Sequence, residues 1–238
     1  INNQAIGKPA NSQSIAGIMT DEYSINLTSG TLPRQSFSAI VENTNMTFEA
    51  VGATSAGQSY VYEPNPIPTG KFNFLYRNDN LGNNSVNTGY FLYFKQGKLN
   101  ATEFNITNAL PNNFVTINTN NINNTDHWLY GLDVNKNVSQ LWTKVPALSG
   151  INVIYNQLTE KNLYQLNTKM SDQVEIVFGD GSFSNIPQGS FIFYHRTSNG
   201  LTYSMTPDDI AKVNIAFSYV SKKNKIETLT VAASLKYT

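Results

Sequence analysis

Alternation of apolar and polar residues is the clearest pattern in the chain, and it predicts β-strands. In residues 71–77 (KFNFLYR) aromatic side chains occupy every second position, which is the period of a half-buried strand. Residues 213–220 (VNIAFSYV) alternate in the same way, and residues 229–237 do so again after the polar run KKNK. The last quarter of the chain therefore predicts a hairpin with one face in water.

The middle of the chain contains apolar runs separated by turn residues. The run YFLYF (90–94) is apolar throughout, and Gln96-Gly97 is expected to turn it into a following strand, KLNATEFNIT (98–107). Asparagine is dense from Asn105 to Asn124, and its side chain competes for backbone hydrogen bonds. That segment is therefore expected to be loop or edge strand.

Proline and glycine divide the chain into three expected regions. Residues 1–66 form an irregular segment or small subdomain that closes on YEPNPIPTG, where proline forbids both helix and central strand. Residues 67–165 are expected to form a β-meander domain, and residues 166–238 a β domain with Gly-Asp-Gly and Pro-x-Gly turns.

Helical spacing of apolar residues is rare. The best windows, residues 14–25 and 156–166, are short and poorly capped, and Pro207 followed by Asp208 and Asp209 is typical of a helix start. The expected fold class is mainly β with minor α: small antiparallel sheets or sandwich-like β domains with one or two short helices.

Composition limits the partners. The 16 basic and 16 acidic residues give a net charge of +0, so no basic field attracts nucleic acid or an anionic membrane. Cysteine is absent, which excludes disulfides and thiolate metal sites, and no run approaches the ~20 apolar residues of a membrane helix. Because the chain begins at Ile1 with neither a methionine nor a leader, it is expected to be a fragment of a longer polypeptide.

No motif for catalysis stands out. There is no Gly-x-Ser-x-Gly turn and no thiol nucleophile. His127 and His195 have no partnered nucleophile in the sequence, so His127 is expected to open a strand and His195 to cap or edge one. A glycosidase needs only two acids a few ångströms apart, so carboxylate pairs stay open as candidates. The acids considered are Asp21, Glu22, Glu49, Glu103, Asp126, Asp133, Asp208 and Asp209.

Asp180 lies between two glycines in the stretch DQVEIVFGDGSFSNIPQGSFIFYHRTSNG (172–200) and could be a catalytic acid, a calcium ligand or a turn residue. A calcium loop needs several oxygen ligands at alternating positions, whereas this loop has one carboxylate. Asp180-Gly181 is instead a preferred connection in a hairpin, because both positions tolerate positive φ. Pro187 and Gly189 then supply a second turn. The sequence therefore predicts that Asp180 turns the chain.

This stretch resembles the baseplate J-like family of contractile tails. The residues that carry the resemblance are Phe178, Gly179, Asp180, Gly181, Pro187, Gly189, Tyr194, Arg196 and Gly200. Ser184 departs from the pattern, because many members have glycine there. The preceding apolar runs and the Asn-rich composition are similar to those of the large baseplate wedge proteins of T-even type phages, in their C-terminal half.

The resemblance implies a structural subunit of the virion, with no catalytic, cofactor-binding or metal-binding residues. Such a subunit is assembled in the host cytoplasm and pairs with itself as a homodimer and with other wedge proteins. The resulting ring surrounds the hub and relays the signal for sheath contraction. Two alternatives stay open. The aromatic and asparagine content suits a tail-associated carbohydrate-binding or glycan-cleaving module, and seven Asn-x-Ser/Thr patterns suit an extracellular glycoprotein.

Overall fold

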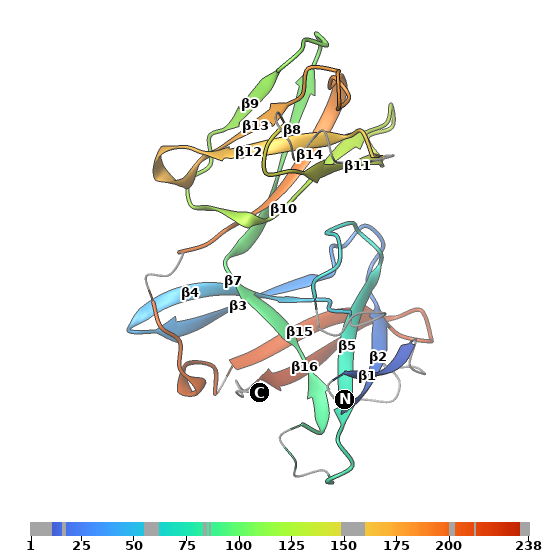
Figure 1. The fold of residues 1–238 in the computed structure, drawn as a ribbon. Coiled ribbons are helices and arrows are strands. Elements are labelled where there is room, and N and C mark those ends of the chain that lie inside the picture. Colours follow the sequence, from blue (N-terminus) through green and yellow to red (C-terminus); the bar gives the residue numbers. More distant parts are fainter. Residues whose placement is uncertain are drawn as a thin grey trace. The chain divides into compact units, whose positions relative to one another are not determined.

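The computed structural model describes residues 11–15, 18–54, 62–82, 85, 87–148, 160–199, 203–211 and 213–233. The chain forms two compact units, and the second (residues 98–200) is inserted into the first (residues 1–97 and 201–238) (Figure 1). The predicted mainly β class is confirmed. Helix among the described residues is confined to two short 3₁₀ turns, η1 (Met170–Asp172) and η2 (Pro207–Ile210).

The first unit contains three antiparallel sheets. The four-stranded sheet has the order β1 (Asn11–Ile15), β2 (Ile18–Asn26), β5 (Lys71–Asn78), β6 (Gly89–Phe91). The three-stranded sheet has the order β3 (Arg34–Val41), β4 (Thr44–Val51), β7 (Tyr93–Gln96). The third is a two-stranded ribbon of β15 (Val213–Val220) and β16 (Ile226–Ala233).

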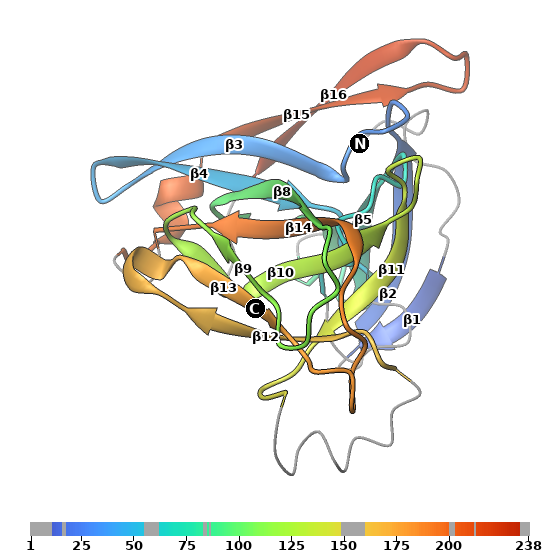
Figure 2. The same cartoon turned by 90° about the horizontal axis from the view of Figure 1, so that it is seen from above.

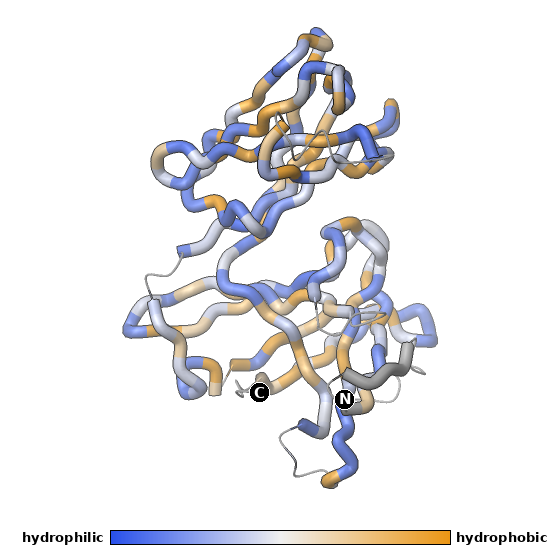
Figure 3. The backbone as a smooth tube through the Cα atoms, in the orientation of Figure 1, coloured by the Kyte–Doolittle hydropathy of each residue, from blue (hydrophilic) through white to orange (hydrophobic). Residues whose placement is uncertain are grey.

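The core of the first unit lies between these sheets because each contributes one apolar face. Phe72 and Phe74 of β5 contact Phe217 of β15, with ring centroids 4.6 and 5.4 Å apart. The predicted terminal hairpin is confirmed: β15 buries every second residue, and Ser221–Lys225 closes the turn. Figure 3 shows the same alternation of polar and apolar residues along the strands.

The second unit is one seven-stranded sheet that curls into a nearly closed barrel (Figure 2). Its order is β8 (Lys98–Ile106), β14 (Gly189–Thr197), β10 (Ile122–Leu132), β11 (Val138–Lys144), β12 (Leu163–Thr168), β13 (Val174–Phe178), β9 (Phe114–Ile117). Only β11 and β12 run parallel; the other neighbours are antiparallel. The inner face is filled by Leu129, Trp142, Ile176, Phe178 and Phe193.

The units are bounded differently from the three expected regions. The expected meander forms only in its first step: β6 pairs with β5, but β7 pairs with β4 in the first unit and β8 pairs with β14 in the second. Gln96-Gly97 is therefore the crossing between the units and not a hairpin turn. Gly97 has φ +105°, so the turn signal is present although the two flanking strands belong to different sheets.

Two other local expectations have clear outcomes. The Asn-rich segment 105–124 does supply an edge strand, β9, at one end of the seven-stranded sheet. Both helical windows were wrong where the structure describes them: residues 18–25 belong to β2 and residues 163–166 to β12. In each case pairing with neighbouring strands overrides a weak helical pattern.

Candidate functional site

The stretch that carries the sequence resemblance lies in the second unit, at the loop between β13 and β14. Phe178 ends β13 and is fully buried, with its ring 5.2 Å from that of Trp142 and 5.7 Å from that of Phe191. The Asp180 carboxylate accepts a hydrogen bond from the backbone N–H of Ser182 (2.9 Å), and Gly181 has φ +92°. Asp180 therefore performs the role of an Asx-turn residue.

One part of the turn interpretation was wrong. β13 and β14 do not form a hairpin, because β13 pairs with β12 and β9 while β14 pairs with β10 and β8. The loop 179–188 is long enough to carry the chain between strands that are not neighbours, so the turns at Asp180 and at Gly189 (φ +97°) bend a crossover. Pro187 lies within this loop, and Gly200 lies outside the described residues.

The positive φ of Gly181 gives a direct test of this turn. Gly181→Val should destabilise the second unit by about 1–3 kcal/mol, because a β-branched residue is strained at that φ. A Cβ there would also lie 3.1 Å from Cδ1 of Ile186. Asp180→Asn should be nearly neutral, because asparagine forms the same turn. Urea unfolding measures both changes, and a large loss of stability in Asp180→Asn would contradict the turn role.

Gly179 is required for a different reason, close packing against Ser184. A Cβ on Gly179 would lie 1.6 Å from the Ser184 hydroxyl oxygen and 3.0 Å from its Cβ. Ser184 is buried, so its hydroxyl has little room to move away. Ser184 thus fills the space in which a side chain at position 179 would otherwise lie.

We expect Gly179→Ala to cost about 1–3 kcal/mol of unfolding free energy through overpacking. Adding Ser184→Gly removes the clashing hydroxyl and should recover part of that loss, whereas Ser184→Gly alone should not be stabilising. Thermal unfolding of the three variants gives the coupling between the two positions. Additive effects would show that the two side chains do not compete for the same space.

Arg196, the motif residue near the end of β14, forms a buried ion pair. Its Nε donates a hydrogen bond to the Asp126 carboxylate of β10 at 2.6 Å, and the two side chains are 1% and 8% exposed. The cross-strand pairing of β10 with β14 brings together residues 70 positions apart in sequence. Sequence reasoning considered Asp126 only as a catalytic candidate and missed this pair, since no local pattern connects the two residues.

The two histidines lie directly opposite each other on β10 and β14, in the interior of the strands. The expectation that His127 opens a strand and His195 caps or edges one was wrong. Strands β10 and β14 continue beyond these histidines in both directions, and each strand pairs with a neighbouring strand on both of its edges. His127 donates from Nε2 to the carbonyl oxygen of Asn124 (2.9 Å), and its Nδ1 accepts from the Tyr164 hydroxyl (2.9 Å). His195 is fully buried and stacks on Phe193.

This environment favours the neutral imidazole. Burial, and then the nearby charge of Lys144, lowers the pKa of His127 to about 4. Burial also lowers the pKa of His195, and burial raises the pKa of the Tyr164 hydroxyl. At neutral pH these histidines are therefore uncharged core groups, and Nε2 of His195 is buried without a hydrogen-bond partner among the described residues.

Several of the acids considered as catalytic candidates serve structural contacts. Glu22 accepts hydrogen bonds from Thr54 (2.7 Å) and Asn73 (2.8 Å), and it points to the opposite face of β2 from its neighbour Asp21. The other contacts are Asp126 with Arg196, Glu103 with Lys136, Asp133 with the backbone N–H groups of Asn135 and Asn137, and Asp209 with Thr206. Asp209 closes a capping box at η2, as the sequence pattern predicts.

The described residues of the first unit include the linings of a wider and a narrower surface hollow. The wider one, of about 730 Å³, is open and is lined in part by Asp208 and Asp209. The narrower groove, of about 210 Å³, lies between the Thr88–Phe94 segment and the base of the β15–β16 ribbon. Its lining is mostly apolar, with Tyr90 at its edge.

Tyr90 belongs to a tyrosine cluster, Tyr23, Tyr76 and Tyr90, on neighbouring strands. The ring centroid of Tyr90 is 5.0 Å from that of Tyr76 and 5.9 Å from that of Tyr23. Burial and the charge of nearby Asp21 raise the pKa of Tyr23 and of Tyr90. Tyr90 is 44% exposed, so the cluster presents one ring to a ligand or partner.

No group of three or more histidine, aspartate and glutamate side chains is placed to hold a metal ion in the described part of the chain. No helix in the described ranges is long and apolar enough to cross a membrane.

Comparison with known proteins gives a family but no activity. The model of a family described as a domain of unknown function, DUF8360, matches residues 1–238, so the chain belongs to that family. No curated protein matches. No solved structure matches either.

Proposed function

We propose that the chain is a structural subunit of a phage tail baseplate wedge, located in the virion. In this role it self-associates and contacts neighbouring wedge proteins, forming the ring around the hub that relays the contraction signal. The proposal rests on the resemblance of residues 178–200 to the baseplate J-like family of contractile tails, together with the similarity of the preceding apolar runs and the Asn-rich composition to the large wedge proteins of T-even type phages.

The proposal is supported most directly by the structural roles of the residues that carry the resemblance. Phe178 fills the core, Asp180 and Gly181 form a turn, Gly179 allows close packing, and Arg196 forms a buried ion pair. Each of these residues serves the scaffold of the barrel. A motif of this kind suits a protein that acts through its shape and its contacts.

The surface chemistry agrees with a role in assembly. The net charge is +0 and only 13% of residues are charged, so specific contacts would come from shape and hydrogen bonds. Among the described strands, the sheets also have edges that pair with no other strand, and such an edge can add a strand from another chain.

Two measurements test this function. Sedimentation over a wide concentration range should show species larger than the monomer; a monomer at every concentration would count against self-association. Antibodies raised against the chain should label the baseplate end of phage particles. Labelling of the capsid alone, or of no particle, would contradict the assignment to the tail.

A second function, glycan binding by a tail-associated module, is favoured by the exposed ring of Tyr90 beside Tyr23 and Tyr76. Aromatic rings with one exposed face stack on sugar rings. A glycan and cell-wall polymer screen decides between the two. Saturable binding that Tyr90→Ala removes, with Tyr203→Ala as an exposed control, would favour glycan binding.

A further inference from the structure

The free edge of β16 is open to pairing with another strand. β16 pairs with β15 along its whole length, and no other strand in the described part of the chain pairs with its second edge. Natural edge strands are usually protected by charge, proline or a bulge. From Thr228 to Ala233 the strand has none of these, and its residues favour extended structure.

From Thr228 to Ala232, the outward face of the β15–β16 ribbon also lacks bulky groups. Thr228, Thr230 and Ala232 of β16 are exposed, and their partners across the ribbon are Ser218, Ala216 and Asn214. An approaching strand would therefore meet neither charge repulsion nor steric obstruction on this face.

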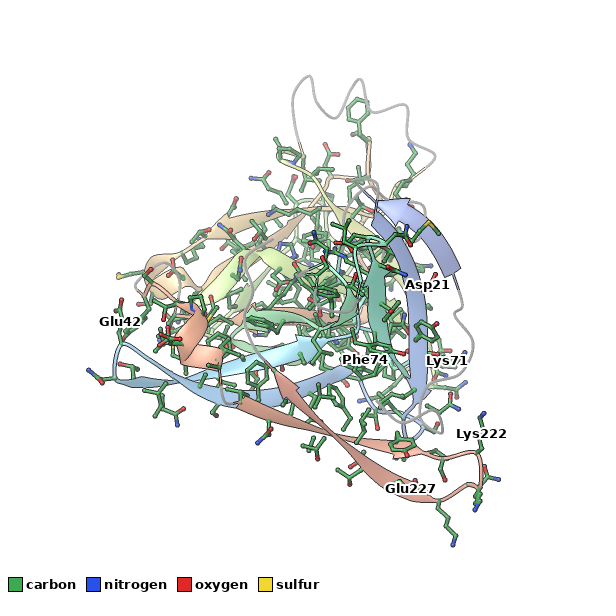
Figure 4. The ribbon with its side chains drawn as sticks, turned by 90° about the horizontal axis from the view of Figure 1, so that it is seen from below. Asp21, Glu42, Lys71, Phe74, Lys222 and Glu227 are labelled. Carbon is green, nitrogen blue, oxygen red and sulfur yellow. The ribbon has the colours of Figure 1, made fainter. Side chains whose placement is uncertain are left out.

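The two ends of the ribbon differ in charge. The tip carries Lys222, Lys223 and Lys225, with Glu227 hydrogen-bonded to the Tyr219 hydroxyl (2.9 Å). Figure 4 places Lys222 and Glu227 at this tip. The tip is thus a basic projection.

The base of the ribbon borders the 210 Å³ groove described above, through Val231, Ala232 and Ala233. Two carboxylates neighbour residues at the Thr88–Tyr90 end of that groove, here called its mouth. Thr88, which lines the groove, donates to the Asp79 carboxylate (2.9 Å), and Tyr90 lies close to the charge of Asp21. Arg77 lies over the ring of the lining residue Phe91, with its guanidinium 5.2 Å from the centroid.

We propose that two copies of the chain pair along β16, antiparallel about a two-fold axis at Thr230, with each basic tip lying in the groove mouth of the other copy. This inference rests on the proposed function in one respect only, self-association. In this register Glu227 lies opposite Ala233 of the second copy and Leu229 opposite its Val231, so Leu229, Val231 and Ala233 share one face with Glu227 at its end, and Thr228, Thr230 and Ala232 share the other.

Charge complementarity favours a second copy as the occupant. Antiparallel pairing reverses the ribbon, so the positive end of one copy meets the negative and aromatic end of the other. In the Thr230 register Lys225 lies roughly 7 Å beyond Ala233 of the second copy, at ~3.3 Å per residue, and Lys222 and Lys223 belong to the turn that Ser221 and Lys225 close. That reach covers the groove mouth, where lysine can contact both carboxylates and tyrosine rings.

The test compares two double substitutions of equal charge on the same ribbon. Thr228→Lys with Thr230→Lys places like charges opposite each other across the proposed two-fold axis, and should weaken self-association roughly tenfold or more. Ala216→Lys with Ser218→Lys puts the same charges on the adjacent strand and should weaken it less. Sedimentation equilibrium gives the dissociation constants, and thermal unfolding checks that each variant is folded.

A complementary pair identifies the interface directly. Mixing the Thr228→Lys, Thr230→Lys variant with a Thr228→Glu, Thr230→Glu variant should restore association between the two different copies. Hydrogen exchange of the wild-type chain should show extra protection of β16 amides at high concentration. This second measurement does not depend on any substitution.

The outcomes separate the inference from the proposed function. If the wild type associates but the β16 variants, the mixture and the exchange protection give no sign of β16 pairing, the inference is overturned and a self-associating subunit stands. If the wild type is a monomer at every concentration, self-association itself fails. Recovery in the Lys and Glu mixture supports both.

Discussion

Replacing Arg196 with methionine should lower the free energy of unfolding of the second unit by about 3–5 kcal/mol, because it leaves the Asp126 carboxylate buried without its charged partner. The two side chains are 1% and 8% exposed, so little water can compensate. Both tryptophans, Trp128 and Trp142, lie on strands of this unit. Urea unfolding followed by tryptophan fluorescence therefore reports on the second unit.

The matched control replaces both charges. Arg196→Met together with Asp126→Leu removes the pair and leaves no buried charge, so most of the lost stability should return. This contrast separates the penalty of an uncompensated charge from lost packing of the arginine side chain. Equal destabilisation by the single and the double variant would show that packing dominates.

Acid should destabilise the second unit between about pH 6.5 and pH 4. His127 titrates near its ordinary pKa of 6.5 in the unfolded chain, while burial lowers its pKa to about 4 in the folded barrel. As the pH falls through this window the unfolded state binds a proton that the folded state does not, so stability decreases. The full loss for His127 is on the order of 3 kcal/mol. The lowered pKa of buried His195 acts in the same direction.

Stability curves at several pH values measure this effect, again with tryptophan fluorescence. His127→Gln keeps a polar side chain at this position but cannot titrate, so its stability should depend less on pH in the same window. Lys144 and Asp126 are the charged groups that act on His127. If the wild type and His127→Gln lose stability in parallel, the histidine is not the group that responds.

Local sequence patterns predicted the positions of individual strands better than they predicted which strands pair with one another. The β15–β16 hairpin was predictable because its alternation, its polar turn and its pairing all lie within about twenty residues. The β8–β14 ladder was not, because it pairs Lys98 with Thr197 across almost a hundred residues. Glycine with positive φ at position 97 is equally compatible with a hairpin and with a crossing between units.

The same limit applies to the candidate sites. The turn role of Asp180 follows from its two glycine neighbours and was visible in the sequence. The role of Asp126 depends on Arg196, and the groove beside Tyr90 depends on Val231 to Ala233, far along the chain. Such sites exist only after distant strands have been brought together.

Residues 98–200 are inserted in the sequence of the first unit, and this determines the order in which the two units can fold during synthesis. The inserted barrel contains all its own strands and can be completed while the ribosome is still translating. The enclosing unit must wait for its final ribbon, whose Phe217 packs on Phe72 and Phe74. A nascent chain that stops before that ribbon would contain a folded barrel and an incomplete first unit with exposed aromatic residues. Exposed surface of this kind is prone to aggregation and is bound by chaperones.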